Sequence, residues 1–132
     1  MPTAIQVRRT AINSPELTPP VGPFSQATEA GGFIYFSGQV GQDPTTGKLV
    51  AGGIAPETER VFRNLSAVLE AAGRSFDDVV RAGVYLANMN DFVAMNGIYA
   101  KHFSQPFPAR TTIAVAALPL GACVEIDLVV KA

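Results

Sequence analysis

The stretch APETERVFRNLSAVLEAAG, residues 55–73, carries the clearest structural pattern in the chain. Its apolar positions recur with the spacing of one face of an α-helix: Val61, Leu65, Val68, Leu69 and Ala72. Pro56 suits a first helical turn, and Gly73 suits the position just past a helix end. Such a helix has to bury its apolar face against another element of the fold.

Four segments on either side of this helix are predicted to be strands, because they are rich in β-branched and aromatic residues. They cover residues 31–41, 77–88, 110–118 and 122–131. Side chains alternate along a strand, so one face of the second segment carries Val80, Ala82, Val84 and Leu86. In the last segment, one face carries Val124, Ile126, Leu128 and Val130, and the other carries Cys123, Glu125, Asp127 and Val129.

A second helix is predicted over residues 90–103, with Asn90 as its N-cap. One face of that helix carries Phe92, Met95, Tyr99 and Phe103. Residues 12–27 contain prolines at 15, 19, 20 and 23 and are predicted to be extended or turning. Residues 42–50 read as a hairpin-like connection, with Asp43, Pro44 and Gly47 as turn residues.

The order of elements predicts one α+β domain, residues 1–132, with two helices on one face of a sheet. The other face of that sheet also carries apolar residues and needs cover. We therefore expect the chain to form a closed oligomer.

Composition excludes several classes of protein. Apolar residues make up 48% and charged residues 16%, and the net charge is −1, which disfavours a nucleic-acid-binding surface. No apolar run reaches membrane-spanning length, and the first ten residues lack the apolar core of a signal peptide. One cysteine, Cys123, and one histidine, His102, predict neither an internal disulfide nor a zinc site, and we expect a cytoplasmic protein.

The stretch PFPARTTIAV, residues 106–115, places a cation at the start of a strand that we expect to be buried. The guanidinium of Arg110 offers two parallel N–H donors, which match a carboxylate. Phe107 and the neighbouring prolines would keep the surroundings dry. The residues alone leave open a structural ion pair with Glu16 or Asp127.

Glu125 and Asp127 are a candidate pair for holding a water molecule, because they lie two residues apart on one strand face. A general base has to lie within hydrogen-bond reach of the water that it activates. The alternative is a solvated strand face.

Ser37 and Gly38 come near the end of the predicted strand 31–41. Gly38 permits a ligand to approach the backbone closely, so its N–H could bind an oxyanion, although a bulge or tight bend would also explain the glycine. A triad that pairs Ser37 with His102 has weak support, because the histidine lies on a predicted helix. Asn96 lies near the buried face of that helix, where an amide needs partners, so it would fix a loop or reach a ligand.

Six blocks carry a family resemblance: GPFSQA, FSGQVG, NLSAVLEAAG, DDVVRAGVYL, MNDFVAMNGIYAKHF and PFPARTTIAVAALPLGACVEID. In this order and spacing the sequence resembles the Rid family, the YjgF-type reactive intermediate deaminases that are also called L-PSP endoribonucleases. The resemblance runs from about Asn13 to Val130. It implies a chorismate-mutase-like α+β fold that forms a barrel-like homotrimer with clefts between subunits. It also implies hydrolysis of enamines and imines, such as 2-aminoacrylate, to 2-oxo acids and ammonia, without a metal or organic cofactor.

The resemblance also implies roles for single residues. Arg110 matches the family arginine that binds the substrate carboxylate, and Glu125 matches the glutamate that positions the attacking water. Ser37 and Gly38 match a strand-end pair that lines the pocket, and Asn96 matches a helix asparagine near the site.

Two positions depart from the common family pattern. Phe24 stands where many deaminating members have tyrosine, so a hydroxyl is missing from the substrate-binding residues. Thr112 stands where many members have cysteine, so thiol chemistry is disfavoured at that position.

Three other functions remain open at this point. A regulatory module that binds small metabolites such as 2-oxo acids would keep Arg110 but lack turnover, as the loss of a hydroxyl at Phe24 suggests. A deaminase for one pathway, acting on 2-aminomuconate or 3-aminoacrylate, would share the chemistry. An endoribonuclease is disfavoured, because the chain has no basic cluster and no tryptophan.

Overall fold

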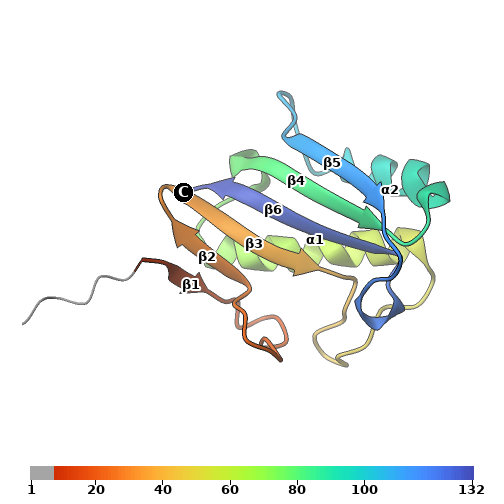
Figure 1. Ribbon diagram of the computed structural model, residues 1–132, viewed down its shortest axis with the longest axis horizontal. Helices are drawn as coiled ribbons and strands as arrows, with labels where there is room; N and C mark the ends of the chain where they lie inside the picture. The colour runs from red at the N-terminus through yellow and green to blue at the C-terminus, as the bar shows by residue number, and fades with distance from the viewer. Residues whose placement is uncertain (1–7) are drawn as a thin grey trace, which may run out of the picture.

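The computed structural model describes residues 8–132, and the N-terminal stretch in which no leader was expected lies largely outside that range. One mixed six-stranded sheet has the strand order β1-β2-β3-β6-β4-β5 (Figure 1). The strands are β1 (Thr10–Ile12), β2 (Ala27–Ala30), β3 (Phe33–Gln39), β4 (Val79–Leu86), β5 (Ala109–Ala114) and β6 (Val124–Lys131). The helices are α1 (Ile54–Ala71) and α2 (Phe92–Tyr99), with 3₁₀ turns η1 (Phe76–Asp78), η2 (Met89–Asp91) and η3 (Pro119–Gly121). Among the strands of the described range, β4 and β5 are the one pair that runs parallel.

Helix α1 buries the predicted apolar face: Val61, Leu65, Val68 and Leu69 are each no more than 2% exposed. The helix ends where the sequence indicates, because Gly73 takes up φ +68° just past its last turn. The N–H of Gly73 donates to the Glu70 carbonyl at 3.0 Å, and the N–H of Arg74 donates to the Leu69 carbonyl at 2.9 Å. These two bonds satisfy carbonyls that the helix would otherwise leave without partners.

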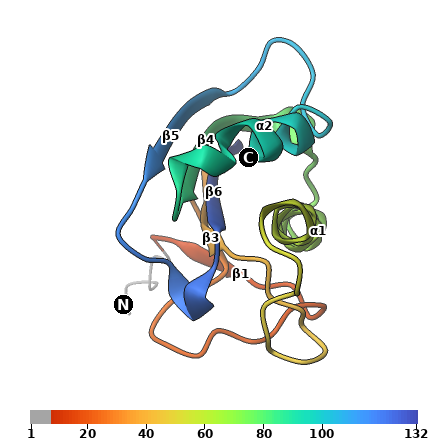
Figure 2. The same ribbon diagram turned by 90° about the vertical axis from the view of Figure 1, so that its right-hand side faces the viewer.

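Both helices cover the same face of the sheet, as predicted (Figure 2). The central strand β6 shows why, since its even-numbered residues are buried under α1 and its odd-numbered residues 125–129 are half-buried on the other side. The predicted alternation of β6 is therefore confirmed. The α+β class with a mixed sheet and two helices on one face is confirmed with it.

The apolar face predicted for β4 is wrong at its first residue, Val80. Val80 is 42% exposed, whereas Val79 is buried at 6%. The pairing of β4 with β6 shifts register between Val79 and Arg81, so an extra residue is inserted there. A bulge of this kind reverses the alternation of the residues before it.

The N-terminal strands and the start of α2 also differ from the predictions. β1 and β2 lie in or beside a segment that was predicted only to be extended or turning. Asn90 is not the N-cap of α2: Asp91 holds that position without a side-chain bond, and the Asn88 side chain accepts the Asn90 N–H at 2.9 Å within η2. α2 ends at Tyr99, before the predicted limit at 103, and the 42–50 connection forms a single bridge between Gln42 and Leu49.

β5 is an exposed edge strand that ends at Ala114, not a buried strand that runs to residue 118. The face of the sheet away from the helices carries further apolar surface in the single chain. Tyr35 is 49% exposed and Ile113 is 43% exposed on that face. An apolar sheet face without cover is the feature from which an oligomer was expected.

Replacing Gly73 with alanine should destabilise the protein by about 1 kcal/mol, because a side chain is strained at positive φ. The matched control is Gly97→Ala inside α2, where an added Cβ meets nothing within 4 Å. That variant should be more stable than the wild type by up to about 1 kcal/mol. Urea denaturation at one fixed protein concentration measures both changes, and shifts of the same sign in the two variants would contradict this account of the helix end.

Candidate active site

The sheet separates the candidate residues into two groups on its opposite faces. Arg110 pairs with Ala82, whose side chain is fully buried in the core under the helices. Glu125 pairs with Tyr85 on the other face. Within one chain, therefore, the sheet lies between the candidate carboxylate anchor and the candidate base.

Arg110 is held by helix α2. Its Nη1 donates to Asn96 Oδ1 at 2.7 Å. Its guanidinium carbon lies 4.5 Å from the centroid of the Tyr99 ring and 5.6 Å from that of Phe92. The amide and the two rings orient the cation without neutralising it. Among residues 8–132, Arg110 forms no ion pair with Glu16 or Asp127, so the structural alternative is not seen there.

Thr112 lies two residues after Arg110 and on the same face of β5. Its hydroxyl is buried and has no hydrogen-bond partner among the described residues. The Tyr99 hydroxyl is in the same condition, and the pKa of Tyr99 is raised by burial although the charge of Arg110 acts in the opposite direction. Polar atoms with unused hydrogen-bonding capacity thus flank the arginine.

Gly38 and Glu125 meet on the other face. The pairing of β3 with β6 shifts register between Phe36 and Gln39, so Gly38 lies in a bulge, as one interpretation of the sequence held. A Cβ at Gly38 would lie 2.7 Å from the carboxyl carbon of Glu125. The glycine therefore leaves room for the carboxylate to lie directly against the backbone.

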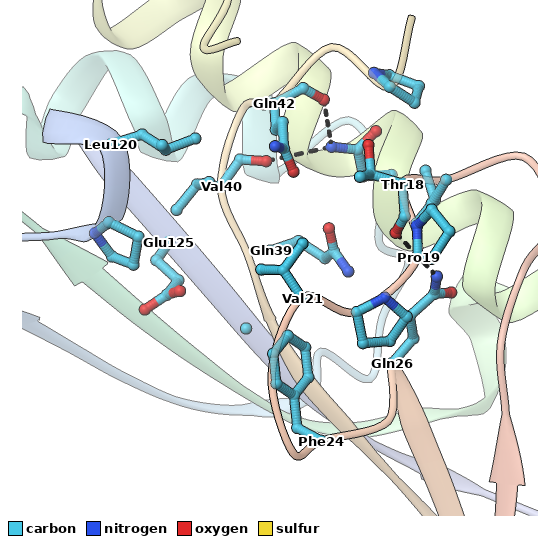
Figure 3. A pocket seen from close by; sticks show the side chains of 16 residues that line it. Thr18, Pro19, Val21, Phe24, Gln26, Gln39, Val40, Gln42, Leu120 and Glu125 are labelled. Carbon is cyan, nitrogen blue, oxygen red and sulfur yellow. Dashed lines mark hydrogen bonds between the residues drawn. The ribbon is translucent and has the colours of Figure 1, made fainter. Parts of the chain in front are cut away.

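A cavity of about 360 Å³ opens beside Gly38 and Glu125 (Figure 3). Phe24 lines it and is 53% exposed. Arg110 and Asn96 do not line this cavity, which agrees with the separation of the two groups. Phe24, Gly38 and Glu125 are thus brought together, as are Arg110, Asn96 and Thr112, but the structure of one chain does not join the two groups.

Glu125 is more basic than an ordinary glutamate. Burial raises the pKa of its carboxyl, and the negative charge of Asp127 raises it further. Asp127 accepts a hydrogen bond from the Tyr85 hydroxyl at 3.0 Å through one of its oxygens. Of the two carboxylates predicted to hold a water, Glu125 is the one that lines the cavity.

The surroundings of Ser37, His102 and Cys123 do not activate any of these side chains for nucleophilic attack. The Ser37 hydroxyl donates to the Ser25 carbonyl at 2.7 Å, and Ser37 has no histidine partner among the described residues. His102 stacks on Phe62 at 4.1 Å between ring centroids, and burial lowers its pKa. Burial and Glu57 raise the pKa of Cys123 to about 11, so it is a neutral thiol at pH 7.

Glu57 is a site-supporting residue that the sequence did not reveal. It is only 2% exposed, and its Oε1 accepts the Cys123 N–H at 2.7 Å, two residues before Glu125. An acidic residue in a first helical turn is expected to face water and favour the helix dipole. No sequence signal distinguishes such a residue from one that is buried and holds a neighbouring strand.

The described residues 8–132 contain no cluster of three or more His, Cys, Asp or Glu side chains that could hold a metal ion. Over the same range, no helix is both long enough and apolar enough to cross a membrane.

Comparisons with known proteins place the chain in a family. The model of the family described as Endoribonuclease L-PSP matches residues 15–132. The chain is 44% identical over 121 residues to the 2-iminobutanoate/2-iminopropanoate deaminase of Homo sapiens. The aligned region covers 92% of this chain and 88% of that protein. This chain belongs to the Rid (YjgF, L-PSP) family.

Two further relatives support the membership in the Rid family. A Dermatophagoides farinae protein, also named 2-iminobutanoate/2-iminopropanoate deaminase, is 43% identical over 90% of this chain and 93% of its own length. The crystal structure of RidA from the Antarctic bacterium Psychrobacter superposes with a TM-score of 0.87 at 40% identity, covering 93% of this chain and 99% of that one. The Rid resemblance seen in the sequence is therefore confirmed.

In this Rid-family chain, Asp127→Asn should lower the pKa of Glu125, because it removes the neighbouring negative charge and keeps an oxygen that can accept from Tyr85. Titration of the Glu125 carboxyl carbon by NMR measures the shift. Asp77→Asn, on the 3₁₀ turn η1, is the matched control and should leave that titration unchanged. A Glu125 pKa that stays the same or rises in Asp127→Asn would contradict the assigned cause.

Proposed function

We propose that this protein hydrolyses reactive enamine and imine intermediates of the 2-aminoacrylate type to 2-oxo acids and ammonia. The observation that carries the proposal is a pair of complementary groups, an oriented and uncompensated Arg110 and a free, basic Glu125 beside a cavity. The names of the deaminase relatives support it. The reaction uses one domain, needs no metal or organic cofactor, and takes place in the cytoplasm.

Arg110 binds the substrate carboxylate through two charge-assisted hydrogen bonds. Asn96 uses one N–H of the guanidinium and leaves others available, while the Tyr99 ring limits rotation of the cation. The backbone around Ser37 and Gly38 and the side chains of Phe24 and Thr112 line the remainder of the site.

Glu125 holds the water that attacks. An enamine is first protonated at carbon to give the imine. The water oxygen then forms a bond to the imine carbon while Glu125 accepts a proton from it. Glu125 passes this proton to the nitrogen of the tetrahedral adduct. The hydroxyl then loses its remaining proton to Glu125, the carbonyl of the 2-oxo acid forms as the carbon–nitrogen bond breaks, and nitrogen leaves as ammonia. Hydrolysis of such imines is already fast in water, so positioning and one base suffice.

The complete site requires two copies of the chain, because Arg110 and Glu125 lie on opposite faces of one sheet. We propose a chorismate-mutase-like homotrimer in which the bare sheet faces form a central barrel. Covering that face would bury Tyr35 and Ile113, which are half-exposed in one chain. The edge strand β5 of one copy would then bring Arg110 to the Glu125 cavity of the next.

Two alternatives make different predictions. The family description names an endoribonuclease, but a net charge of −1 and scattered basic residues give RNA no basic surface. A regulatory module that binds 2-oxo acids would keep the arginine and lack turnover, and the enzymatic test below distinguishes it.

Arg110→Ala should lower kcat/KM for a carboxylate-bearing imine by about 100-fold or more, since two charge-assisted hydrogen bonds are lost. Pyruvate release from 2-aminoacrylate generated in situ, measured above the spontaneous rate, tests this. Arg63→Ala, on an exposed position of α1, is the control and should behave as wild type. Turnover by Arg110→Ala at the wild-type rate would refute the mechanism, and pyruvate binding without turnover in wild type would favour the regulatory module.

Mixed assemblies test whether the site lies between copies. Arg110→Ala and Glu125→Gln chains should each be inactive alone but regain activity when refolded together in equal amounts. If each site takes Arg110 from one copy and Glu125 from the next, about one quarter of the sites receive both native residues. Recovery of about 25% of wild-type activity is therefore expected, and no recovery in assemblies shown to be mixed would place both residues in one chain's site.

A further inference from the structure

The cavity beside Glu125 extends well past the two groups that handle the carboxylate and the imine. Its outer wall is the loop before β2 together with the η3 turn (Figure 3). We call the apolar part of this wall the recess, and its residues are Leu17, Pro19, Pro20, Val21, Phe24, Pro119 and Leu120. The recess is continuous with Gly38 and Glu125, so a substituent on the reacting carbon would point into it.

Most polar side chains of the same cavity are occupied by internal hydrogen bonds. Asn64 donates to the carbonyls of Val40 and Gln42 at 3.1 and 3.0 Å. Gln26 accepts the Ser14 N–H at 2.7 Å and donates back to the Ser14 carbonyl. These amides support loops and have little capacity left for a ligand, so they add little polar character to the recess.

Gln39 and Thr18 are the exceptions, because neither side chain makes a hydrogen bond with the described residues. Both line the cavity (Figure 3). The free amide and the free hydroxyl could each bind one polar group of a substrate. The surrounding wall is otherwise built from prolines, aliphatic side chains and the Phe24 ring, in which an unpaired polar group would be costly.

The size of the cavity exceeds what a small imine needs. A methyl group occupies roughly the volume of a water molecule, about 30 Å³ in the liquid. The cavity measures about 360 Å³. Part of this volume receives the imino and carboxylate groups and Arg110 of the next copy. Along the apolar walls that remain, a branched or aromatic side chain would displace more water than the methyl of 2-iminopropanoate.

We infer that the recess receives the side chain of the substrate, and that the protein favours 2-imino acids with branched aliphatic or aromatic side chains over 2-iminopropanoate. This inference rests on the proposed imine hydrolysis at Glu125 and adds the substrate class to it. Phe24 is then a specificity residue, and its lack of a hydroxyl keeps the recess apolar.

The test compares imines made in situ by an amino-acid oxidase from alanine, leucine, phenylalanine and glutamine. Hydrolysis is followed as the competition between the protein and a semicarbazide trap. The value of kcat/KM for the leucine-derived imine should exceed that for the alanine-derived imine by about tenfold or more, since each methylene in an apolar pocket adds severalfold. Phe24→Ala should reduce this ratio by about threefold or more.

Two exposed valines give a matched pair of variants, one on the recess and one away from it. Val21, on the recess, is 93% exposed, and Val93, on α2 and away from it, is 81% exposed. Val21→Ser should reduce the leucine-to-alanine ratio, and Val93→Ser should not.

The outcomes separate this inference from the proposed function. If no imine is hydrolysed faster than in water, the proposed function fails. Equal values for leucine- and alanine-derived imines, or higher values for alanine, would overturn the recess assignment and leave imine hydrolysis standing. A preference for the glutamine-derived imine that Gln39→Leu abolishes would also overturn it, because the cavity would then select polar side chains.

Discussion

Strand β6 has one face buried beneath α1 and the other face without cover, and this asymmetry determines where the functional groups lie. The buried face contributes four residues to the core, each no more than 2% exposed: Val124, Ile126, Leu128 and Val130. The same alternation sends Glu125 and Asp127 to the bare face, where Glu125 lies against Gly38 beside β3 and pairs with Tyr85 of β4. A carboxylate in these surroundings is partly desolvated, which raises the pKa of Glu125 and makes it a better base. Burial of one face and the placement of the candidate base on the other thus both follow from the two-residue period of the strand.

Patterns that depend on local geometry were predictable from sequence. The apolar stripe of α1, the left-handed Gly73 and the alternation of β6 follow from helical and strand periods and from the glycine requirement of the helix end. The errors arise where tertiary pairing overrides a period. The bulge beside Val80 inserts one residue and reverses the facing of Val79, and no property of this valine-valine pair signals it. The exposure of β5 depends on its place at the sheet edge, and strand order is a long-range property.

The candidate site was predictable as a set of residues but not as an arrangement. Arg110, Asn96, Gly38 and Glu125 were singled out by residue type, position and family resemblance. Their division between two faces follows from the parallel register of β5 on β4, which pairs Arg110 with Ala82. That register is invisible in the sequence of one chain. The sequence predicted that the amide of Asn96 needs a partner, but it did not identify Arg110 as that partner. Glu57 was missed for the related reason that a first-turn carboxylate gives no sign of burial.

The inactivity of the other reactive side chains narrows the chemistry that the fold supports. Ser37 donates its proton to a carbonyl, Cys123 is held as a neutral thiol, and His102 is stacked inside an aromatic cluster on the helix side. Covalent catalysis would need one of these groups activated by a base, and none of them is. What remains is a fixed cation and one basic carboxylate, which together can orient a carboxylate-bearing electrophile and a water but cannot form an acyl or thioester intermediate. An imine is the kind of electrophile for which that is enough, because water adds to it without covalent assistance and its nitrogen leaves readily once protonated. The limits of the side chains and the reactivity of the substrate therefore point to the same reaction.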